Sequence, residues 1–413
     1  MVKRPTSQRG SSKVLLSDFW RPRVRWVGAL ALIAMVTAGK LALTLGSGPV
    51  DAAPAAPAAA VLTDDNAPHR RPVKVVAPER LKLKAAQGEV MVPAYSSIAL
   101  GDAKPHPGIR RAVIVVHGRL RDADRYFELA GKALKASGAD AETLLIAPQI
   151  ITTADAARHD LPPSTARWKN ESWLGGDPAK GPYPVSSFEI LDGIAALLAD
   201  RARFPNLERI VFAAHSGGAQ LVQRYAVVGR ADAVISATGL VALADGTDSA
   251  AGKASIRLRY VVANPSSYLY FDAQRPVNIA HCREQDRWRY GLNDPVPYVV
   301  AQGDARSFEA RYLGRRVIYL LGGNDIDPNH SALDKSCAGE AQGAFRLERG
   351  NNYFAHLQRR AKAQNLALRH SRVEVPGVGH EAERMFNSVC GRAALFDAAG
   401  CDMKPGEAMM APK

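Results

Sequence analysis

The sequence predicts an α/β protein in which a mostly parallel central sheet carries helices on both of its faces. Short apolar runs rich in β-branched residues alternate along the chain with stretches of helical period, which is typical of parallel strands joined by crossover helices. Most of these runs are continuously apolar, as strands buried on both faces of a sheet are. With 413 residues, of which 47% are hydrophobic and 23% charged, the chain is long enough for one such domain with insertions.

Six runs are the candidate strands of this sheet: 112–116, 143–147, 209–213, 256–262, 316–321 and 371–375. Between the second and the third, a capping box formed by Ser186 and Glu189 predicts the start of a helix with one apolar face. The interval 265–315 is rich in aromatic residues, Pro and Gly and is too long for an ordinary connection, so we expect it to form a lid insertion.

The N-terminal part of the chain has the composition of an export address. Residues 1–25 carry seven Lys and Arg against one Asp and predict a basic cytoplasmic n-region, and the apolar run of 26–46 follows directly. This run is either a signal peptide or an uncleaved signal anchor, and Lys40 inside it favours cleavage. Residues 47–80 are rich in Ala and Pro and predict an extended linker, which leaves 81–413 as the folded domain.

This organisation changes the meaning of the net charge of +14. Much of the excess belongs to the predicted export address, and after residue 80 no stripe of Lys and Arg is interleaved with aromatic residues. We therefore expect no nucleic-acid partner. The protein is expected in the periplasm or the extracellular space, or tethered to the membrane by an uncleaved N-terminal segment.

A serine follows the third candidate strand at a sharp turn. The strand 209–213 leads into Ala214-His215-Ser216-Gly217-Gly218, and a helical stretch follows at once. This is the pattern of a nucleophile elbow, G-x-S-x-G, with Ala214 in place of the first Gly. Small residues are needed on either side because the serine is held in a strained backbone conformation. The sequence therefore predicts Ser216 as a nucleophile.

A serine hydroxyl needs a base, and the base needs a carboxylate to orient it. The strand 316–321 ends in a Gly-Gly turn followed by Asp325 and Asp327, and the strand 371–375 leads to His380 after a Gly-Val-Gly turn. Both groups follow the carboxyl end of a strand, where α/β sheets place their sites. We expect His380 to be the base and Asp325 the orienting acid, with Asp327 held in reserve as a residue of an Asx turn.

Backbone N–H groups are expected to bind the oxyanion that develops during acyl transfer. The strand 112–116 ends in His117-Gly118-Arg119, and this turn places the N–H of Arg119 over the site, with the N–H of Gly217 as the second donor. His117 is expected to act structurally, with its ring tying down the loop.

The four cysteines predict disulfides in an exported chain. Cys390 and Cys401 are eleven residues apart and are expected to pair, which would leave Cys282 with Cys337, although four cysteines allow three connectivities. No C-x-x-C or H-x-x-x-H spacing is present, so we expect no metal site.

Taken together, these motifs resemble the α/β-hydrolase superfamily from about residue 110 to residue 390. Three further stretches, 262–270, 288–292 and 337–350, are similar to a subgroup of exported hydrolases whose substrate is not firmly assigned. The resemblance implies a serine hydrolase with Ser216, Asp325 and His380 as its triad and with no cofactor.

Hydrolysis of a carboxylic ester through an acyl-enzyme is the function we expect first, on a small or polymeric ester. Aromatic residues in and around the predicted lid favour an apolar or aromatic acyl group: Trp173, Tyr268, Tyr270, Trp288, Tyr290 and Tyr298. The same triad would also serve an amidase, a peptidase or an acyltransferase, and the fold would also serve a binding protein without turnover.

Overall fold

A computed structural model describes residues 67–246 and 254–412, with the backbone alone for 305 and 306. The predicted n-region 1–25, the predicted signal peptide or anchor 26–46 and most of the predicted linker 47–80 lie outside the described residues. Within the described ranges, no helix combines the length and the apolar character needed to cross a membrane.

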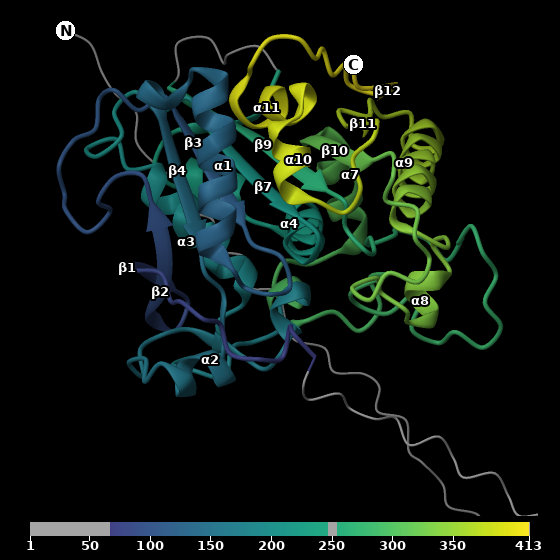
Figure 1. Ribbon diagram of the computed structural model, residues 1–413, viewed down its shortest axis with the longest axis horizontal. Helices are drawn as coiled ribbons and strands as arrows, with labels where there is room; N and C mark the ends of the chain where they lie inside the picture. Colours follow the sequence, from purple (N-terminus) through teal and green to yellow (C-terminus); the bar gives the residue numbers. More distant parts are fainter. Residues whose placement is uncertain (1–66, 247–253, 413) are drawn as a thin grey trace, which may run out of the picture. The chain divides into compact units, whose positions relative to one another are not determined.

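A single large sheet forms the centre of the domain (Figure 1). Its strands follow one another in the order β1-β2-β4-β3-β7-β9-β10-β11-β12, and β8 pairs with β9 off this path. The bounds of its strands are β1 (Glu79–Ala85), β2 (Gly88–Ser96), β3 (Arg111–Val116), β4 (Thr143–Pro148), β7 (Arg209–His215), β8 (Val241–Ala244), β9 (Ser255–Ala263), β10 (Arg316–Gly322), β11 (Ser371–Val375) and β12 (Ala408–Met410).

The pairing of the strands confirms the predicted mostly parallel sheet. From β4 to β12 every described pair of neighbours is parallel, and only β2 runs against its neighbours β1 and β4. All six candidate strands are strands of this sheet. A separate two-stranded sheet joins β5 (Ile151–Thr152) to β6 (Arg167–Trp168).

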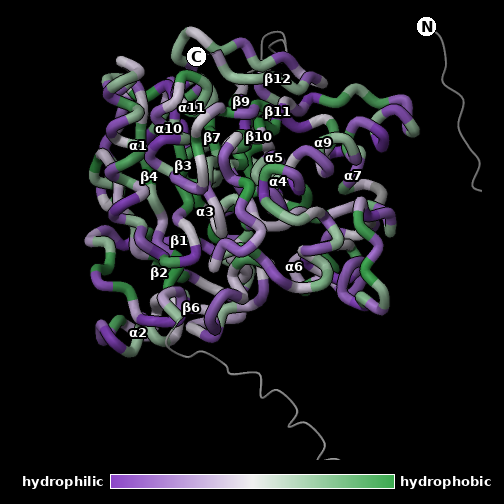
Figure 2. The backbone as a smooth tube through the Cα atoms, turned by 45° about the vertical axis from the view of Figure 1, so that its right-hand side comes forward, coloured by the Kyte–Doolittle hydropathy of each residue, from purple (hydrophilic) through white to green (hydrophobic). Residues whose placement is uncertain are grey.

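Helices cover both faces of the sheet, and the alternation of side chains along the strands explains why. In β3, Ile114 faces one apolar cluster while Val113 and Val115 face the other. The first cluster includes α3 (Ser187–Leu198), α4 (Gly217–Val228), α5 (Ala231–Ser236), α7 (Ala305–Gly314) and α9 (Arg346–Ala363). The second includes α1 (Ala123–Ser137), α10 (Ala382–Asn387) and α11 (Val389–Phe396). In Figure 2 much of the tube through the central strands β3, β7, β9 and β10 is coloured as hydrophobic.

Short helices complete the described chain: η1 (Asp140–Glu142), α2 (Thr153–Arg158), η2 (Ser172–Gly175), α6 (Pro297–Val300) and α8 (Cys337–Glu340). The helix predicted from its capping box is α3. The Ser186 hydroxyl accepts a hydrogen bond from the N–H of Phe188 over 3.1 Å, and the Glu189 carboxylate accepts one from the N–H of Ser186 over 2.8 Å.

The prediction of a lid over 265–315 is not confirmed. Tyr268 and Tyr270, at the start of this interval, are fully buried in the first cluster, and α7 at its end packs in the same cluster. A disulfide joins Cys282, in the middle of the interval, to Cys337 at the start of α8. The interval is therefore tied into the body of the domain at several points.

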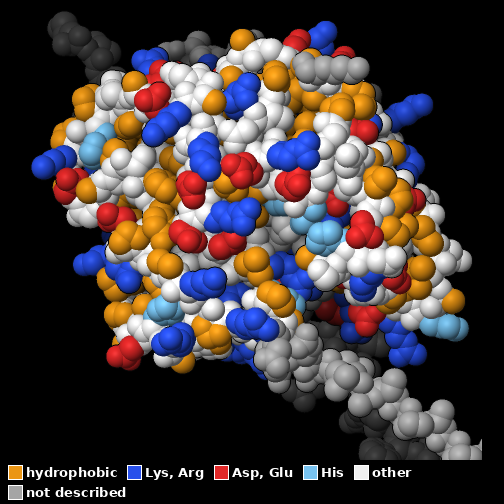
Figure 3. Space-filling view, in the orientation of Figure 1, with side chains coloured by type: hydrophobic (Ala, Val, Ile, Leu, Met, Phe, Trp, Pro, Cys, Tyr) orange, Lys and Arg blue, Asp and Glu red, His pale blue; other side chains and the backbone are white. Residues whose placement is uncertain are grey.

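The second disulfide joins Cys390 of α11 to Cys401. Both bonds follow the pairing that the sequence favoured. On the face of the molecule seen in Figure 3, Lys and Arg side chains are interspersed with Asp and Glu side chains rather than gathered in one patch.

Candidate active site

Ser216 occupies a tight turn between β7 and α4. Its φ of 58° and ψ of −124° lie in a region that L-residues seldom adopt, and the serine stands directly before the first helical residue, Gly217. A side chain at Gly218 would bring its Cβ to 2.4 Å from the carbonyl oxygen of His117 and 2.6 Å from that of Val116. The turn therefore requires a glycine at 218, where the start of α4 passes against the end of β3.

Three of the predicted site residues lie in one hydrogen-bonded chain. His380 Nε2 is 2.8 Å from Ser216 Oγ, and His380 Nδ1 is 2.8 Å from Asp325 Oδ2. Asp325 follows β10 and His380 follows β11, so the carboxyl ends of three parallel strands of one sheet bring the three side chains together. Asp325 is buried, while Ser216 and His380 line a cavity.

Asn264, at the end of β9, joins the two loops that carry the histidine and the aspartate. Its side chain accepts a hydrogen bond from the N–H of Gly322 over 2.8 Å and donates one to the carbonyl of Gly379 over 3.0 Å. Its φ of 46° is in the left-handed region, which asparagine tolerates better than most residues. The sequence analysis did not assign this residue to the site.

Arg346, the first residue of α9, lies behind the aspartate and was also missed. Its Nη1 donates to Asp325 Oδ1 over 3.1 Å, and its Nε donates to Ser266 Oγ over 3.1 Å. Both Arg346 and Asp325 are buried. Burial raises the pKa of Asp325, but the hydrogen bond from His380 and the charge of Arg346 together hold that pKa below its usual value. Asp325 is therefore ionised at neutral pH.

The pKa of His380 is lowered, first by burial and then by the charge of Arg346, while its hydrogen bond to Asp325 acts in the opposite direction. Two further imidazoles pack against its ring, at centroid distances of 4.6 Å for His215 and 5.1 Å for His330. Burial also lowers the pKa of each of these two rings. His380 is therefore neutral at physiological pH and can accept a proton.

The two N–H groups predicted for the oxyanion are close to each other. The ideal Cβ position of Gly217 is 3.0 Å from the backbone nitrogen of Arg119. Within the described chain, neither the Arg119 N–H nor the Gly217 N–H donates a hydrogen bond to another residue. His117 holds the loop, since its Nε2 accepts from the N–H of Ile150 over 2.9 Å and its Nδ1 donates to the Gly118 carbonyl over 2.8 Å. Burial lowers the pKa of His117 to about 4, so the ring stays neutral.

Asp327, the alternative orienting acid, is exposed and contacts a neighbouring residue rather than His380. Its Oδ1 accepts a hydrogen bond from the N–H of Asn329 over 2.8 Å, which is the Asx turn expected as its structural role. It makes no hydrogen bond to His380 in the described chain, where the imidazole Nδ1 is paired with Asp325.

Comparisons with known proteins add a finding about the fold. No protein-family model matches the chain, and no curated protein sequence matches it. Among solved structures it is similar to poly(aspartic acid) hydrolase-1 from Sphingomonas sp. KT-1, with 18% sequence identity and a TM-score of 0.52; the match covers 78% of this chain and 100% of that chain. The chain has the α/β-hydrolase fold. A poly(3-hydroxybutyrate) depolymerase from Bordetella parapertussis also matches, with 20% identity and a TM-score of 0.49 over 76% of this chain and 86% of that chain.

In this α/β-hydrolase fold, Ser216 and His380 open into a cavity of about 700 Å³. Its remaining lining mixes apolar, acidic and basic side chains: Ala67, Pro68, His69, Gly118, Arg119, Leu120, Asp122, Arg125, Tyr126, His215, Ser331, Ala332, Glu381, Ala382, Glu383 and Arg384. The cavity is lined by none of the six aromatic residues from which we predicted an apolar acyl pocket. That interpretation is wrong for this cavity, because five of the six are buried in the core and Trp288 is partly buried against it.

Residues 67–69 line one side of the cavity, and they begin the segment 67–78, which we call the N-terminal strap. Arg121 donates from Nη1 to the carbonyl of His69 over 2.6 Å and from Nε to Asp155 Oδ2 over 2.7 Å. Asp155 Oδ1 in turn accepts from the N–H of Val73 over 2.7 Å. Arg121, Asp155 and Val73 are all buried. Packing of the chain thus begins earlier than the predicted domain start at residue 81.

The strap also contacts the side chain of Arg119. The Arg119 guanidinium forms an ion pair with Glu171, and its Nη2 lies 3.1 Å from His69 Nε2. The strap and the loop before η2 therefore fix the residue whose backbone N–H was predicted for the oxyanion.

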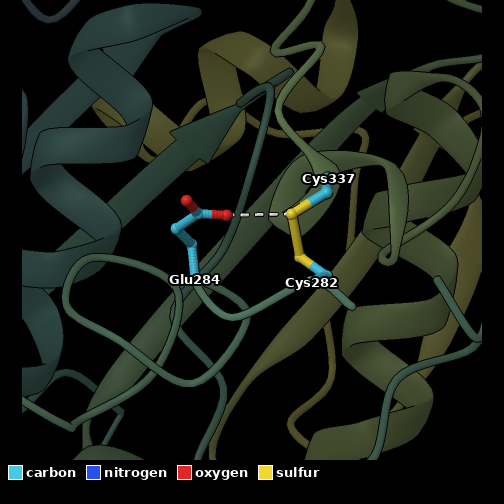
Figure 4. Close-up of side chains that lie close together, drawn as sticks. All are labelled: Cys282, Glu284 and Cys337. Atoms are coloured by element: carbon cyan, nitrogen blue, oxygen red, sulfur yellow. Dashed lines mark hydrogen bonds between the residues drawn. A yellow bond between two sulfur atoms is a disulfide. The ribbon is translucent and has the colours of Figure 1, made fainter. Parts of the chain in front are cut away.

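In the described residues, one group of side chains has the spacing of a metal site: Cys282, Glu284 and Cys337 (Figure 4). The two cysteines form a disulfide, and Glu284 Oε2 lies 3.0 Å from the sulfur of Cys337. A disulfide offers no thiolate to a metal ion, so this group is a covalent cross-link with a neighbouring carboxylate.

Proposed function

We propose that the protein is a serine hydrolase that cleaves carboxylic esters through an acyl-enzyme intermediate. The observation that carries the proposal is the hydrogen-bonded chain from Ser216 Oγ through His380 to Asp325, with 2.8 Å for each of its two contacts. Nucleophile, base and orienting acid are at the distances that proton transfer requires. No metal and no cofactor takes part in the reaction we propose.

In the first half-reaction, Ser216 Oγ forms a bond to the ester carbonyl carbon while its proton moves to His380 Nε2. The carbonyl oxygen takes the electron pair and becomes an oxyanion. When the carbonyl re-forms, the bond from carbon to the alcohol oxygen breaks, and His380 returns the proton to that oxygen. The alcohol leaves, and the acyl group remains on Ser216 as an ester.

In the second half-reaction, His380 removes a proton from water and the water oxygen attacks the acyl carbon. The bond to Ser216 Oγ then breaks, the serine recovers its proton from His380, and the carboxylic acid leaves. Asp325 stays ionised throughout and stabilises the imidazolium at Nδ1. Its fixed position between His380 and Arg346 supports this role.

The oxyanion of both half-reactions would be bound by the N–H groups of Arg119 and Gly217. These donors are free within the described chain and face no reorganisation when charge develops. Loss of a single donor of this kind costs about a hundredfold to a thousandfold in kcat.

We also propose that the enzyme works outside the cytoplasm, after export by its N-terminal segment or on a membrane anchor formed by that segment. Two disulfides are compatible with an oxidising compartment, and the basic and apolar composition of 1–46 supports export. Similar solved structures are described as hydrolases of quite different polymers, poly(aspartic acid) and poly(3-hydroxybutyrate), and therefore do not select a substrate.

Labelling with a fluorophosphonate tests the proposed nucleophile. The probe should label the purified protein once, at Ser216, and Ser216→Ala should abolish both labelling and hydrolysis of short-chain esters. Ser331→Ala is a matched control, because Ser331 lines the same cavity but belongs to no part of the proposed triad. Equal labelling of wild type and Ser216→Ala would refute the assignment. Product analysis with an added alcohol and with amide substrates separates hydrolysis of esters from acyl transfer and from amide cleavage.

A further inference from the structure

A second, smaller cavity lies beside the proposed oxyanion position. It has a volume of about 160 Å³, and it shares Arg119 and Ala332 with the larger cavity. The rest of its lining is Glu171, Leu174, Gln220, Ser266, Arg289, Leu333, Asp334 and Lys335. Since one water molecule needs about 10–15 Å³ of such probe-occupied volume, the cavity is large enough for a short chain of several heavy atoms.

The walls of this cavity are fixed by buried hydrogen bonds. Arg224 of α4 donates from Nη1 to the carbonyl of Leu174 over 3.0 Å and from Nε to the carbonyl of Arg289 over 3.1 Å. The indole of Trp288 donates to the carbonyl of Gly175 over 2.7 Å. The segment that carries Arg289 is therefore bound to η2 on the opposite wall, and the cavity is preformed.

The described side chains of the cavity form one ion pair and carry a net positive charge. Both carboxylates are already satisfied, since Glu171 pairs with Arg119, and Asp334 accepts from Tyr290, Ser336 and Ser267.

Arg289 differs from these groups. Among the described residues its guanidinium forms no ion pair within 4.0 Å, and its Cζ lies 5.8 Å from the ring centroid of Tyr290. Burial lowers the pKa of Arg289, but Tyr290 and the charges of Asp334 and Glu171 together raise that pKa above its usual value, so the side chain is a cation. Lys335 is exposed and donates to the carbonyl of Pro328. The side chains of the cavity thus carry one more positive than negative charge.

We propose that this cavity binds a carboxylate carried by the acyl part of the substrate, with Arg289 as its partner. The proposal rests on the proposed ester hydrolysis at Ser216. It identifies the substrate class as esters of short acyl groups that end in an acid, such as half-esters of four-carbon or five-carbon dicarboxylic acids.

The position of the cavity supports this assignment. The Leu174 side chain, which lines it, comes within 3.4 Å of the ideal Cβ position of Gly217. An acyl chain whose carbonyl oxygen meets the N–H groups of Arg119 and Gly217 therefore passes Leu174 and enters the small cavity. Two methylene groups and a carboxylate, five heavy atoms in all, form a chain short enough to enter it. A guanidinium binds a carboxylate through two parallel hydrogen bonds, which a neutral chain end cannot form.

The test compares two methyl esters of similar shape, monomethyl succinate and methyl 4-methylpentanoate, by titration of the released acid at constant pH. We expect wild type to prefer the succinate in kcat/KM by about tenfold to a hundredfold, the range expected for a hydrogen-bonded charge. Arg289→Gln should lower the ratio of the two kcat/KM values toward one. Arg289→Lys should keep part of the preference, since the charge remains but the paired geometry is lost.

Arg287→Gln is the matched control, because it removes the same charge from the same segment at an exposed side chain that lines neither cavity. Its ratio should equal that of wild type. If Arg289→Gln does not fold, Arg289→Lys carries the comparison with the control. The inference is overturned if wild type shows no preference for the succinate, or if Arg289→Gln and Arg287→Gln change the ratio equally.

Fluorophosphonate labelling separates failure of this inference from failure of the proposed function. A wild type that is labelled at Ser216 but has a ratio near one overturns the carboxylate cavity and leaves the hydrolase. A wild type that is neither labelled nor active on either ester overturns both.

Discussion

The close approach of Gly218, next to the turn that carries Ser216, to the end of β3 gives a quantitative test of what keeps Ser216 in position. At Gly218, an added Cβ would lie 2.4 Å and 2.6 Å from the carbonyl oxygens of His117 and Val116. Ordinary contacts of a Cβ begin at 3.4 Å, so each separation must grow by about 1 Å. Both oxygens belong to the main chain of a central strand and its loop, and neither can rotate away as a side chain would.

We therefore expect Gly218→Ala to lower the free energy of unfolding by about 3 kcal/mol, the upper end of the range for overpacking in a rigid core. The substitution should also move the start of α4 away from the loop that carries Arg119. In the proposed mechanism the N–H groups of Gly217 and Arg119 both bind one oxygen atom, so a shift of about 1 Å should lower kcat/KM about a hundredfold.

Urea unfolding and the hydrolysis of a short-chain methyl ester measure the two effects. Gly131→Ala is the matched control, because Gly131 lies inside α1 and a Cβ there meets no atom within 4 Å. It should raise the free energy of unfolding by about 1 kcal/mol through helix propensity and leave kcat/KM unchanged. If Gly218→Ala is as stable and as active as wild type, the close approach of α4 to β3 is not what holds the serine in place.

Three further predictions concern buried charges. First, the acidic limb of the kcat/KM profile should lie below pH 6.5, because burial and the charge of Arg346 lower the pKa of His380, and only the neutral imidazole can act as base; a limb above pH 6.5 would contradict this. Second, Arg346→Gln should move that limb to higher pH, since it removes a cation that faces His380, and should cost about 3–5 kcal/mol in urea unfolding by leaving Asp325 without its buried partner. Third, Asp155→Asn should cost a similar 3–5 kcal/mol by breaking its buried pair with Arg121, while fluorophosphonate labelling persists below the unfolding transition.

The groups around His380 show why the Arg346→Gln test reports on the charge of Arg346. Asp325 and Arg346 lie on one side of its ring, and His215 and His330 pack against it. Burial lowers the pKa of each neighbouring imidazole, and His330 lowers the pKa of His380 less than Arg346 does. The charge of Arg346 is therefore the main positive charge whose removal the limb should report.

The sheet could be predicted from the sequence because its inner strands are buried on both faces. The run 112–116, for example, is apolar at every position, and β3 has every residue buried. The outer strands β1 and β2 were missed for the opposite reason. β1 alternates apolar residues with Lys82 and Lys84. It therefore lacks the continuous apolar run by which the inner strands were predicted, and only its period-two alternation indicates a strand.

The three residues of the hydrogen-bonded chain could be found because each follows a strand and carries a local signature of small residues. Arg346 and Asn264 carry no such signature. Arg346 reaches Asp325 from the start of α9, and Asn264 reaches Gly322 from the end of β9, 58 positions away in the sequence. Contacts of this kind depend on the packing of the finished fold, which a single sequence does not report.

The aromatic residues were misinterpreted for the same reason, because a single sequence does not report which of them the fold buries. Their number near the predicted lid favoured an apolar acyl group, but Tyr268 and Tyr270 are buried in the core and line neither cavity. A buried cation is costly unless a partner or solvent stabilises it, and Arg346, Arg121 and Arg119 each have a carboxylate for this purpose. Among the described residues Arg289 forms no ion pair within 4.0 Å, and the carboxylates of Asp334 and Glu171 act on it from farther away. The net positive lining of the small cavity, rather than the aromatic content of the chain, supports the proposed acyl group that carries its own negative charge.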